Sequence, residues 1–234
     1  MHFAFPPPQT VGLHIQGSNA RFPVRRVYCV GRNYAAHARE MGFDPDREPP
    51  FFFCKPGDAA SVVPVAQGEV RELPYPPQTG NYHFEAELVV AIGKPGRDIA
   101  VADAAQHIFG VAAGLDMTRR DLQIRMREQG RPWEVGKAFD YSAPIGPLRL
   151  CSDGAVFDRG ALTLEVDGKL RQNSDLTHLI WSVSEVIANL STLFALEPGD
   201  VIFTGTPEGV GAVVPGQALT VRIDGLAPLA VKIV

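Results

Sequence analysis

The chain has 234 residues, with 22 Lys and Arg against 26 Asp and Glu, and its formal net charge is −4. A hydrophobic content of 45% is ample for one large or two small packed domains, which excludes intrinsic disorder. The 23 Gly and 20 Pro residues follow no Gly-X-Y period, so they indicate many turns between short strands and exclude a long helical bundle. The negative charge gives no electrostatic reason to bind nucleic acid or an anionic membrane.

The three cysteines, Cys29, Cys54 and Cys151, are an odd number in a chain too long to need disulfides, which indicates reduced thiols. No Cys–His motif accompanies them, so we interpret them as small buried hydrophobic residues. Prolines at 6–8 interrupt the apolar N-terminus, which lacks the basic region of a signal peptide. No apolar run approaches the ~18 residues of a membrane span. We therefore expect a cytoplasmic protein.

The first 25 residues form a Pro-rich segment with one strand-like run at 11–15, and we interpret residues 26–234 as a single domain. An apolar run at 27–30 predicts a strand. Residues 34–41 predict a helix, with Asn33 as its N-cap and Gly42 as its C-terminal stop.

From residue 51 onward the pattern is mainly that of β-structure, with predicted strands at 51–54 and 84–92. In the second strand, alternate residues from Ala86 to Ile92 share one face, which places Glu85 and Glu87 on the other. The chain then alternates short predicted elements: a helix at 101–107, a strand at 109–115, a helix at 118–128 and a loop at 130–147.

Two hairpins are predicted in the last third of the chain, with turns at 167–168 and 224–225. Between them, Ser182 and Glu185 have the spacing of a capping box, which predicts a helix from there to about residue 196. The sequence therefore predicts an α+β, strand-dominated domain with short helices.

Three carboxylates are the first candidates for a functional site. Glu85 and Glu87 on one strand face lie within reach of a single ion, although a solvent-facing strand is the alternative explanation. Asp116 ends a buried apolar run, where a carboxylate needs a partner, and its alternative role is a helix N-cap. Together the three oxygens would suit Mg²⁺ or Mn²⁺ and leave positions open for substrate and water.

Basic residues occur before and after the three acidic residues along the chain. A substrate that itself carries carboxylate groups would require such cations. The candidates are Lys55, Arg119, Arg120 and Lys137. We assign Arg125, Arg127 and Arg131 to a solvated helix face and leave them out of the site.

His37 and Glu40 lie at i and i+3 of the predicted helix. They fit a general base and the carboxylate that orients it, with an ordinary surface pair as the alternative. The Gly-rich stretch at 204–211 follows an apolar strand and would allow its backbone to approach a ligand closely.

Several short motifs occur in a characteristic order along the chain. They are Gly31-Arg32-Asn33-Tyr34, His37 with Glu40, Lys55-Pro56, Glu85-x-Glu87, Asp116 with residues 120–123, Gly136-Lys137-x-Phe139-Asp140, and residues 198–207. In order and spacing they resemble the fumarylacetoacetate hydrolase superfamily, from about residue 27 to the C-terminus.

The resemblance implies a mixed β-roll domain, a homodimer, and Mg²⁺ or Mn²⁺ held by residues that match Glu85, Glu87 and Asp116. It also implies a catalytic His–Glu dyad and lysine, and four substrate contacts. These positions match His37, Glu40 and Lys137 as catalytic residues, and Lys55, Arg120, Gln123 and Thr206 as substrate contacts.

Two departures from the family pattern are Leu115, where many members have Asn, and Arg119, where many have Ala. Residues 27–34 resemble the corresponding segment of acylpyruvate hydrolases, and residues 115–120 resemble that of fumarylpyruvate hydrolases of gentisate breakdown. We therefore expect a metal-dependent hydrolase that cleaves a carbon–carbon bond of a 2,4-diketo acid, converting fumarylpyruvate into fumarate and pyruvate. Arg119 would suit a second carboxylate on such a substrate.

Other functions are compatible with the same residues. The metal site would also serve an oxaloacetate decarboxylase or a keto-acid isomerase or dehydratase, and the His–Glu dyad is what favours hydrolysis. A non-catalytic binding protein for small dicarboxylates is an alternative of another class.

Overall fold

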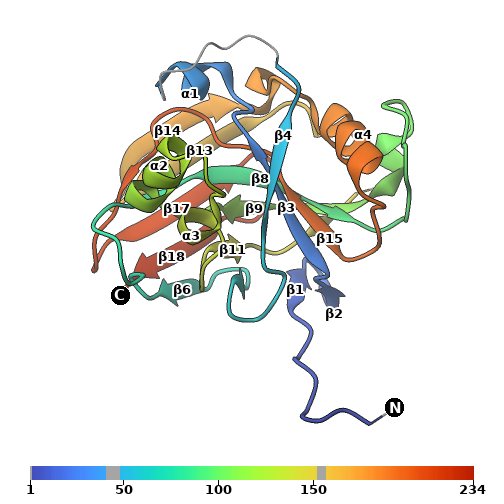
Figure 1. Cartoon of the computed structure of the whole chain (residues 1–234), viewed down its shortest axis with the longest axis horizontal. Coiled ribbons are helices and arrows are strands. Elements are labelled where there is room, and N and C mark those ends of the chain that lie inside the picture. The colour runs from blue at the N-terminus through green and yellow to red at the C-terminus, as the bar shows by residue number, and fades with distance from the viewer. Residues whose placement is uncertain (1, 41–47, 152–156) are drawn as a thin grey trace.

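A mixed sheet lies at the centre of the computed structural model, which describes residues 2–40, 48–151 and 157–234 (Figure 1). Its strands, in spatial order, are β4 (Phe51–Lys55), β3 (Arg26–Gly31), β15 (Asp200–Phe203), β8 (Ala86–Ile92), β9 (Ile108–Leu115), β11 (Ala143–Ile145) and β5 (Val62–Pro64), and β12 (Arg149–Leu150) also pairs with β9. The strand β8 pairs antiparallel with both β9 and β15, whereas β15 runs parallel to β3.

Three smaller sheets complete the β-structure of the described residues. The largest contains, in order, β14 (Lys169–Asp175), β13 (Ala161–Val166), β17 (Ala218–Ile223), β18 (Leu229–Ile233) and β6 (Val70–Leu73). The others are β10 (Thr118–Arg119) with β7 (Tyr82–Phe84) and β16 (Gly211–Ala212), and the hairpin of β1 (Gly12–Ile15) with β2 (Ser18–Pro23). The strand-dominated α+β class is confirmed.

The described helices are short and connect or cover the strands. They are α1 (Ala35–Glu40), α2 (Arg120–Glu128), α3 (Glu134–Lys137) and α4 (Val183–Leu193), with 3₁₀ turns at Ala104–His107 and Leu176–His178. None of them is long and apolar enough to cross a membrane. In Figure 1, α2 and α3 lie together on one side of the central sheet, and α4 lies on the other side of β3 and β4.

The central strand β8 is buried on both of its faces. Leu88 and Val90 belong to the main hydrophobic cluster, and Val89 and Ala91 belong to a second cluster under the N-terminal hairpin. A near-continuous apolar run is typical of a strand covered on both sides. A solvent-facing strand is therefore excluded as the explanation of the Glu-x-Glu pattern.

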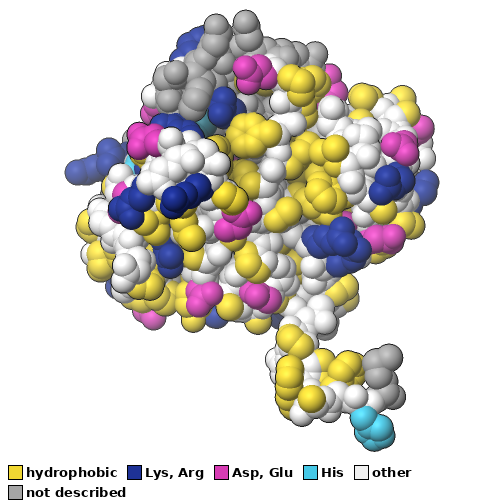
Figure 2. Space-filling model, in the orientation of Figure 1, with side chains coloured by type: hydrophobic (Ala, Val, Ile, Leu, Met, Phe, Trp, Pro, Cys, Tyr) yellow, Lys and Arg dark blue, Asp and Glu magenta, His cyan; other side chains and the backbone are white. Residues whose placement is uncertain are grey.

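The N-terminal segment consists of two parts. Leu13 and Phe22, in the hairpin β1–β2, pack in the second hydrophobic cluster. Before the hairpin the chain extends away from the body of the molecule (Figure 2) and leaves Phe3 and Phe5 63% and 74% exposed.

Several predicted elements are confirmed. Both hairpins form at their predicted turns. The capping box is present, because the Ser182 side chain accepts a hydrogen bond from the Glu185 amide and the Glu185 carboxylate binds the Ser182 backbone.

Other predictions need correction. The helix predicted at 118–128 begins only at Arg120, after the strand β10, and the loop predicted at 130–147 contains α3 and β11. The thiol of Cys54 is exposed and not buried. Gly42, the predicted helix stop, lies outside the described residues.

Candidate active site

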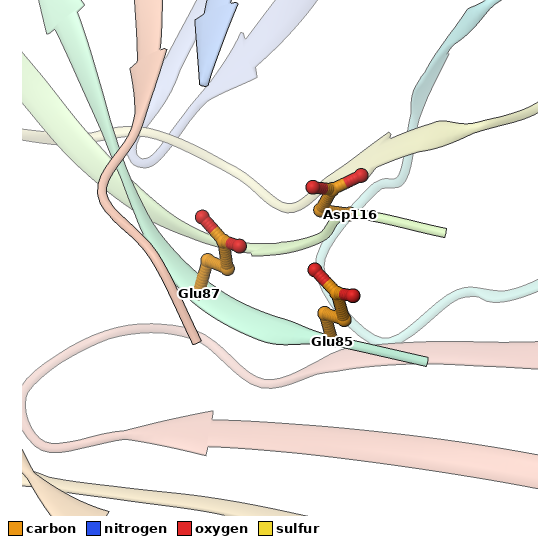
Figure 3. A group of neighbouring side chains, drawn as sticks. All are labelled: Glu85, Glu87 and Asp116. Carbon is orange, nitrogen blue, oxygen red and sulfur yellow. The ribbon is translucent and has the colours of Figure 1, made fainter. Parts of the chain in front are cut away.

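Three carboxylates converge where β8 begins and β9 ends. Glu85 directly precedes β8 and Glu87 is its second residue, so their side chains leave the same face of the strand. The pairing of Ala86 with Leu115 brings Asp116 beside them. One oxygen from each carboxylate lies within 4.8 Å of the other two, and Figure 3 shows the glutamate carboxylates projecting to the side on which Asp116 lies. All three residues are buried.

Three buried cations pair with these carboxylates. The Nζ of Lys137 lies 2.7 Å from both Glu85 Oε2 and Asp116 Oδ2. The Nζ of Lys55 lies 2.8 Å from Asp116 Oδ1, and the guanidinium of Arg120 forms an ion pair with Glu85. Charges removed from water require such partners, so these contacts maintain the cluster in the protein interior. Asp116 is therefore not a helix N-cap, and Arg119 occupies that position of α2.

Glu85 and Glu87 differ in how firmly they hold a proton. Burial opposes ionisation of Glu85, yet Lys137 and Arg120 hold the pKa of its carboxyl well below the usual range. Burial, followed by the charges of Asp116 and Glu85, raises the pKa of Glu87 well above its ordinary value. A cation among the three oxygens would remove the repulsion that favours this proton. The donor set and its charge therefore fit a divalent metal ion.

Lys137 remains an ammonium group at this position. Burial opposes its charge, but Asp116 and Glu85 raise its pKa above the ordinary lysine value. Gly136 allows α3 to carry Lys137 close to α2, because a Cβ at that position would lie 2.7 Å from the Gln123 amide nitrogen.

A tight backbone turn supports Glu87. The amide of Gly205 donates a hydrogen bond of 2.7 Å to Glu87 Oε2. Gly205 has a φ of 100°, and a Cβ there would lie 2.7 Å from the Cβ of Asn33. Only glycine fits this position without strain.

Asn33 has a different role from the predicted N-cap. Its side-chain amide donates to the carbonyls of Trp181 and Thr204, at 2.9 and 2.8 Å, and its Oδ1 accepts from the Trp181 amide at 2.7 Å. These bonds connect the start of α1 to the loop that follows β15.

Gln172 is a buried supporting residue that sequence reasoning missed. Its Oε1 accepts from the Ala86 amide at 3.0 Å, and its Nε2 donates to Thr206 Oγ1 and the Pro207 carbonyl at 2.9 and 2.8 Å. It thereby connects the start of β8 to the loop at 204–211. Its position in a strand with otherwise polar, exposed neighbours gave no signal of this role.

The His37 imidazole and the Glu40 carboxylate contact each other on α1, with Nδ1 and Oε2 separated by 3.1 Å. His37 is buried, so the pair is not an ordinary surface contact. Glu40 also accepts hydrogen bonds from the Gly209 amide at 3.1 and 3.2 Å. Because a carboxylate only accepts, Nδ1 carries the proton and Nε2 of the neutral ring is left as a base.

One cavity brings His37 of the dyad together with the three carboxylates. Its described lining comprises Val30, Gly31, Arg32, His37, Phe53, Glu85, Glu87, Asp116, Arg120, Gln123, Arg127, Trp133, Lys137 and Thr206.

Most of the predicted site residues line this cavity, with three differences. Glu40 is outside the described lining and contacts His37, which belongs to it. Lys55 is not part of its described lining; it pairs with Asp116 and donates to the Met117 carbonyl at 3.2 Å. Arg119 is not part of the lining either, and its guanidinium lies 4.4 Å from the centre of the Phe139 ring.

Sequence reasoning also missed residues that do line the cavity. Arg127, which we assigned to a solvated helix face, is one of them, together with Arg32, Phe53 and Trp133. Arg127 lies at i+7 from Arg120, a helical spacing that could have marked it. Arg32, Phe53 and Trp133 come from separate segments that only the fold brings together, so no pattern marks them.

The sequence model of the fumarylacetoacetate (FAA) hydrolase C-terminal family matches residues 26–234. The chain belongs to the fumarylacetoacetate hydrolase family. This membership agrees with the resemblance carried by the sequence motifs.

Relatives within the fumarylacetoacetate hydrolase family include enzymes of two activities. A crystal structure of fumarylpyruvate hydrolase from Pseudomonas aeruginosa, in complex with Mn²⁺ and pyruvate, is 63% identical, with a TM-score of 0.96 over 100% of this chain and 99% of that one. A fumarylpyruvate hydrolase from a Ralstonia species is 50% identical over 68% of this chain and 82% of its own length. An oxaloacetate tautomerase from Escherichia coli is 38% identical over 90% and 93% of the two chains.

Proposed function

We propose that this protein is a metal-dependent hydrolase that cleaves the carbon–carbon bond of an acylpyruvate, with fumarylpyruvate as its substrate. The observation that carries the proposal is one cavity lined by the carboxylate triad and by the buried His37, whose ring contacts Glu40. The structural relative that binds Mn²⁺ and pyruvate supports it, because pyruvate is one product of this reaction.

Glu85, Glu87 and Asp116 would hold Mg²⁺ or Mn²⁺ at the inner end of the cavity. The bound ion supplies a Lewis acid that polarises the 2-keto carboxylate end of the substrate. Arg120, Gln123 and Thr206 line the same region and orient that end of the substrate by hydrogen bonds. Lys55 contributes by fixing Asp116, with which it forms an ion pair.

His37 acts as the general base. Its Nε2 takes a proton from a water molecule, and the oxygen of that water bonds to the distal carbonyl carbon of the substrate. Glu40 holds the ring in the required tautomer and stabilises the imidazolium that forms. Glu40 is itself held by the Gly209 amide, so the orientation of the dyad depends on the loop at 204–211.

The bond between the distal carbonyl carbon and the adjacent methylene carbon then breaks. Its electron pair passes into the enolate of pyruvate, and the other fragment leaves as a carboxylic acid. The Lys137 ammonium lies at the carboxylate triad and stabilises the negative charge that develops on the enolate oxygen. The proton taken from water finally returns to the methylene carbon and gives pyruvate.

Purified protein mixed with fumarylpyruvate tests this proposal. We expect the diketo absorbance to disappear with Mg²⁺ or Mn²⁺ present, with fumarate and pyruvate formed in equal amounts. Full activity after chelation of the metal, or no turnover with either metal, would refute it. A protein that binds fumarylpyruvate without turning it over would be the non-catalytic binding protein.

Oxaloacetate tautomerisation is a second candidate, favoured by several relatives of that activity that are 38–41% identical. It requires proton transfer at carbon but no attack by water. Parallel assays with oxaloacetate and fumarylpyruvate separate the two functions. We expect the larger kcat/KM with fumarylpyruvate, because the His37–Glu40 dyad is suited to activating water.

The biological setting follows from this assignment. We place the reaction in gentisate-type breakdown of aromatic compounds, in the cytoplasm, and assign residues 26–234 as the catalytic domain of a homodimer. Sedimentation of the purified protein tests the dimer directly.

A further inference from the structure

One face of α2 follows the cavity from its inner end toward solvent. Arg120, Gln123 and Arg127 occupy i, i+3 and i+7 and all line the cavity. Arg120 contacts Glu85 and donates to Gln123 Oε1 at 3.0 Å, and both Arg120 and Gln123 are buried. Arg127 lies about 10 Å farther along the helix axis, is only half-buried, and leans back toward the preceding turn. Its guanidinium therefore belongs to the outer part of the cavity.

An aromatic wall leads to the same outer part from another direction. The Nζ of Lys137 lies 5.2 Å from the centre of the Phe53 ring, which lies 6.0 Å from the Trp133 ring. Trp133 packs edge-on against Phe51 at 5.3 Å, and the guanidinium of Arg32 lies 5.2 Å from the Phe51 centroid. A row of aromatic rings, inclined to one another by 52° and 89°, thus connects the inner lysine to an outer arginine.

The backbone at Arg32 is held in an uncommon conformation. Its φ is 55°, in the left-handed region that residues other than glycine seldom adopt. A Cβ on the preceding Gly31 would lie 2.0 Å from the Phe51 ring, so only glycine allows this approach. Strained conformations persist where the surrounding structure fixes them and are concentrated at functional sites. Here the result is a guanidinium at the cavity.

Two positive charges of the outer cavity lie close enough to affect each other. Burial and the charge of Arg127 lower the pKa of the Arg32 guanidinium, against the opposite effect of Glu48. An anion that binds in this part of the cavity would be attracted by both charges. Figure 2 shows basic side chains gathered over α2 on this side of the molecule.

We propose that Arg32 and Arg127 bind the distal carboxylate of the substrate and thereby select dicarboxylic acylpyruvates over monocarboxylic ones. This inference rests on the proposed function. It moves the role of binding the second carboxylate from Arg119, whose guanidinium lies over Phe139, to Arg32 and Arg127. The inner cations Lys55, Lys137 and Arg120 contact the carboxylate triad and therefore belong to the end of the cavity that would hold the metal ion and the keto acid. Phe53 and Trp133 lie between the two ends and match the planar unsaturated segment of a fumaryl group.

The test compares kcat/KM for fumarylpyruvate and for acetylpyruvate, which has the same diketo end and a methyl group in place of the distal carboxyvinyl group. We expect Arg127→Gln to lower kcat/KM for fumarylpyruvate about 10- to 100-fold, the effect of losing a charge-assisted hydrogen bond. The value for acetylpyruvate should change less than about twofold, and Arg127→Lys should restore part of the loss.

Arg32→Asn should produce the same substrate-dependent loss, because asparagine tolerates the left-handed conformation and the fold is preserved. Arg125→Gln is the matched control, since Arg125 is an exposed arginine on the same helix outside the cavity lining. It should leave both substrates unchanged.

The outcomes are distinct. Equal losses for both substrates, or no loss for fumarylpyruvate in either variant, would overturn the subsite while the wild-type activity still supports the proposed function. Wild-type protein without turnover of either substrate would refute the proposed function, and the subsite with it.

Discussion

The two ends of the cavity are built in different ways. At the inner end, buried acids and bases are fixed by the register of β8 and β9 and by direct ion pairs. At the dyad end, which is distinct from the outer part with Arg32 and Arg127, His37 and Glu40 are carried by the short helix α1, and the described loop contact of Glu40 is with the Gly209 amide. The rigid end is suited to holding a metal ion and the keto acid, and the less supported end is suited to admitting substrate and water.

Removing the acids of the inner end should have the largest effect. We expect Glu85→Gln with Glu87→Gln to weaken Mn²⁺ binding more than about 100-fold and to abolish turnover, because each change removes a ligand charge. Calorimetric titration with Mn²⁺ measures this. Glu72→Gln, an exposed glutamate of β6, should bind Mn²⁺ like the wild type. Unchanged affinity in the double variant would contradict the ligand assignment.

Changing the dyad should reduce catalysis and leave the inner end intact. We expect His37→Ala to lower kcat about 10²- to 10⁴-fold, as for loss of a general base, with Mn²⁺ affinity within about threefold of wild type. Steady-state assays and calorimetry on the same protein separate these effects. His14→Ala, in the N-terminal hairpin, is the control. A His37→Ala protein with normal kcat would contradict the assignment of general-base catalysis to the dyad.

Gly205 links the two ends, and its replacement should destabilise the fold. Gly205→Ala should lower the free energy of unfolding by about 3 kcal/mol, from the left-handed backbone and a clash with Asn33. Gly216 has a similar φ of 97° but nothing within 4 Å of a Cβ, so Gly216→Ala should cost only about 1 kcal/mol. Urea denaturation of both variants measures the difference. Equal losses would show that the contact with Asn33 carries no cost.

The smallest expected effect is a pH dependence of the free energy of unfolding. It arises from Asp121 at the start of α2, which lies outside both ends of the cavity. Burial opposes ionisation of Asp121, but hydrogen bonds from Thr79, Gly80 and Leu122 lower its pKa. A carboxyl group whose pKa is lower in the folded state than in the unfolded state stabilises the protein at pH values above its unfolded-state pKa of about 3.9. This stabilisation is lost as the pH falls through the folded-state pKa.

Asp121→Asn should therefore destabilise the protein by about 1 kcal/mol at neutral pH, a value kept small because Asp121 is partly exposed. The difference from wild type should shrink below about pH 4. Thermal unfolding at several pH values measures it, and a difference that stays constant with pH would contradict this role.

The sequence was most informative where function depends on short local patterns. The alternation at 84–92 placed Glu85 and Glu87 on one face, and the i, i+3 spacing placed His37 beside Glu40, because strand and helix periods are fixed by local geometry. The hairpins and the capping box were predictable for the same reason, since each is determined by a few adjacent residues.

Contacts between distant segments were not predictable from the sequence. Gln172 and Gly205 support the triad through bonds that span more than 80 residues, and no local pattern marks them. Arg127 was assigned to the solvated face because charged residues on this stretch fit ordinary i, i+3 or i, i+4 pairs, whereas the packing of α2 decides which of its arginines reaches the cavity. The role of Asn33 was missed for a related reason, since its partners come from residues 181 and 204.

The most direct test of the central claim is turnover of fumarylpyruvate in water labelled with heavy oxygen. Attack by water that His37 has deprotonated should place one labelled oxygen in the newly formed carboxylate of fumarate, in a reaction that requires Mn²⁺ or Mg²⁺. Fumarate formed without the label, or consumption of fumarylpyruvate without formation of fumarate and pyruvate, would contradict the account.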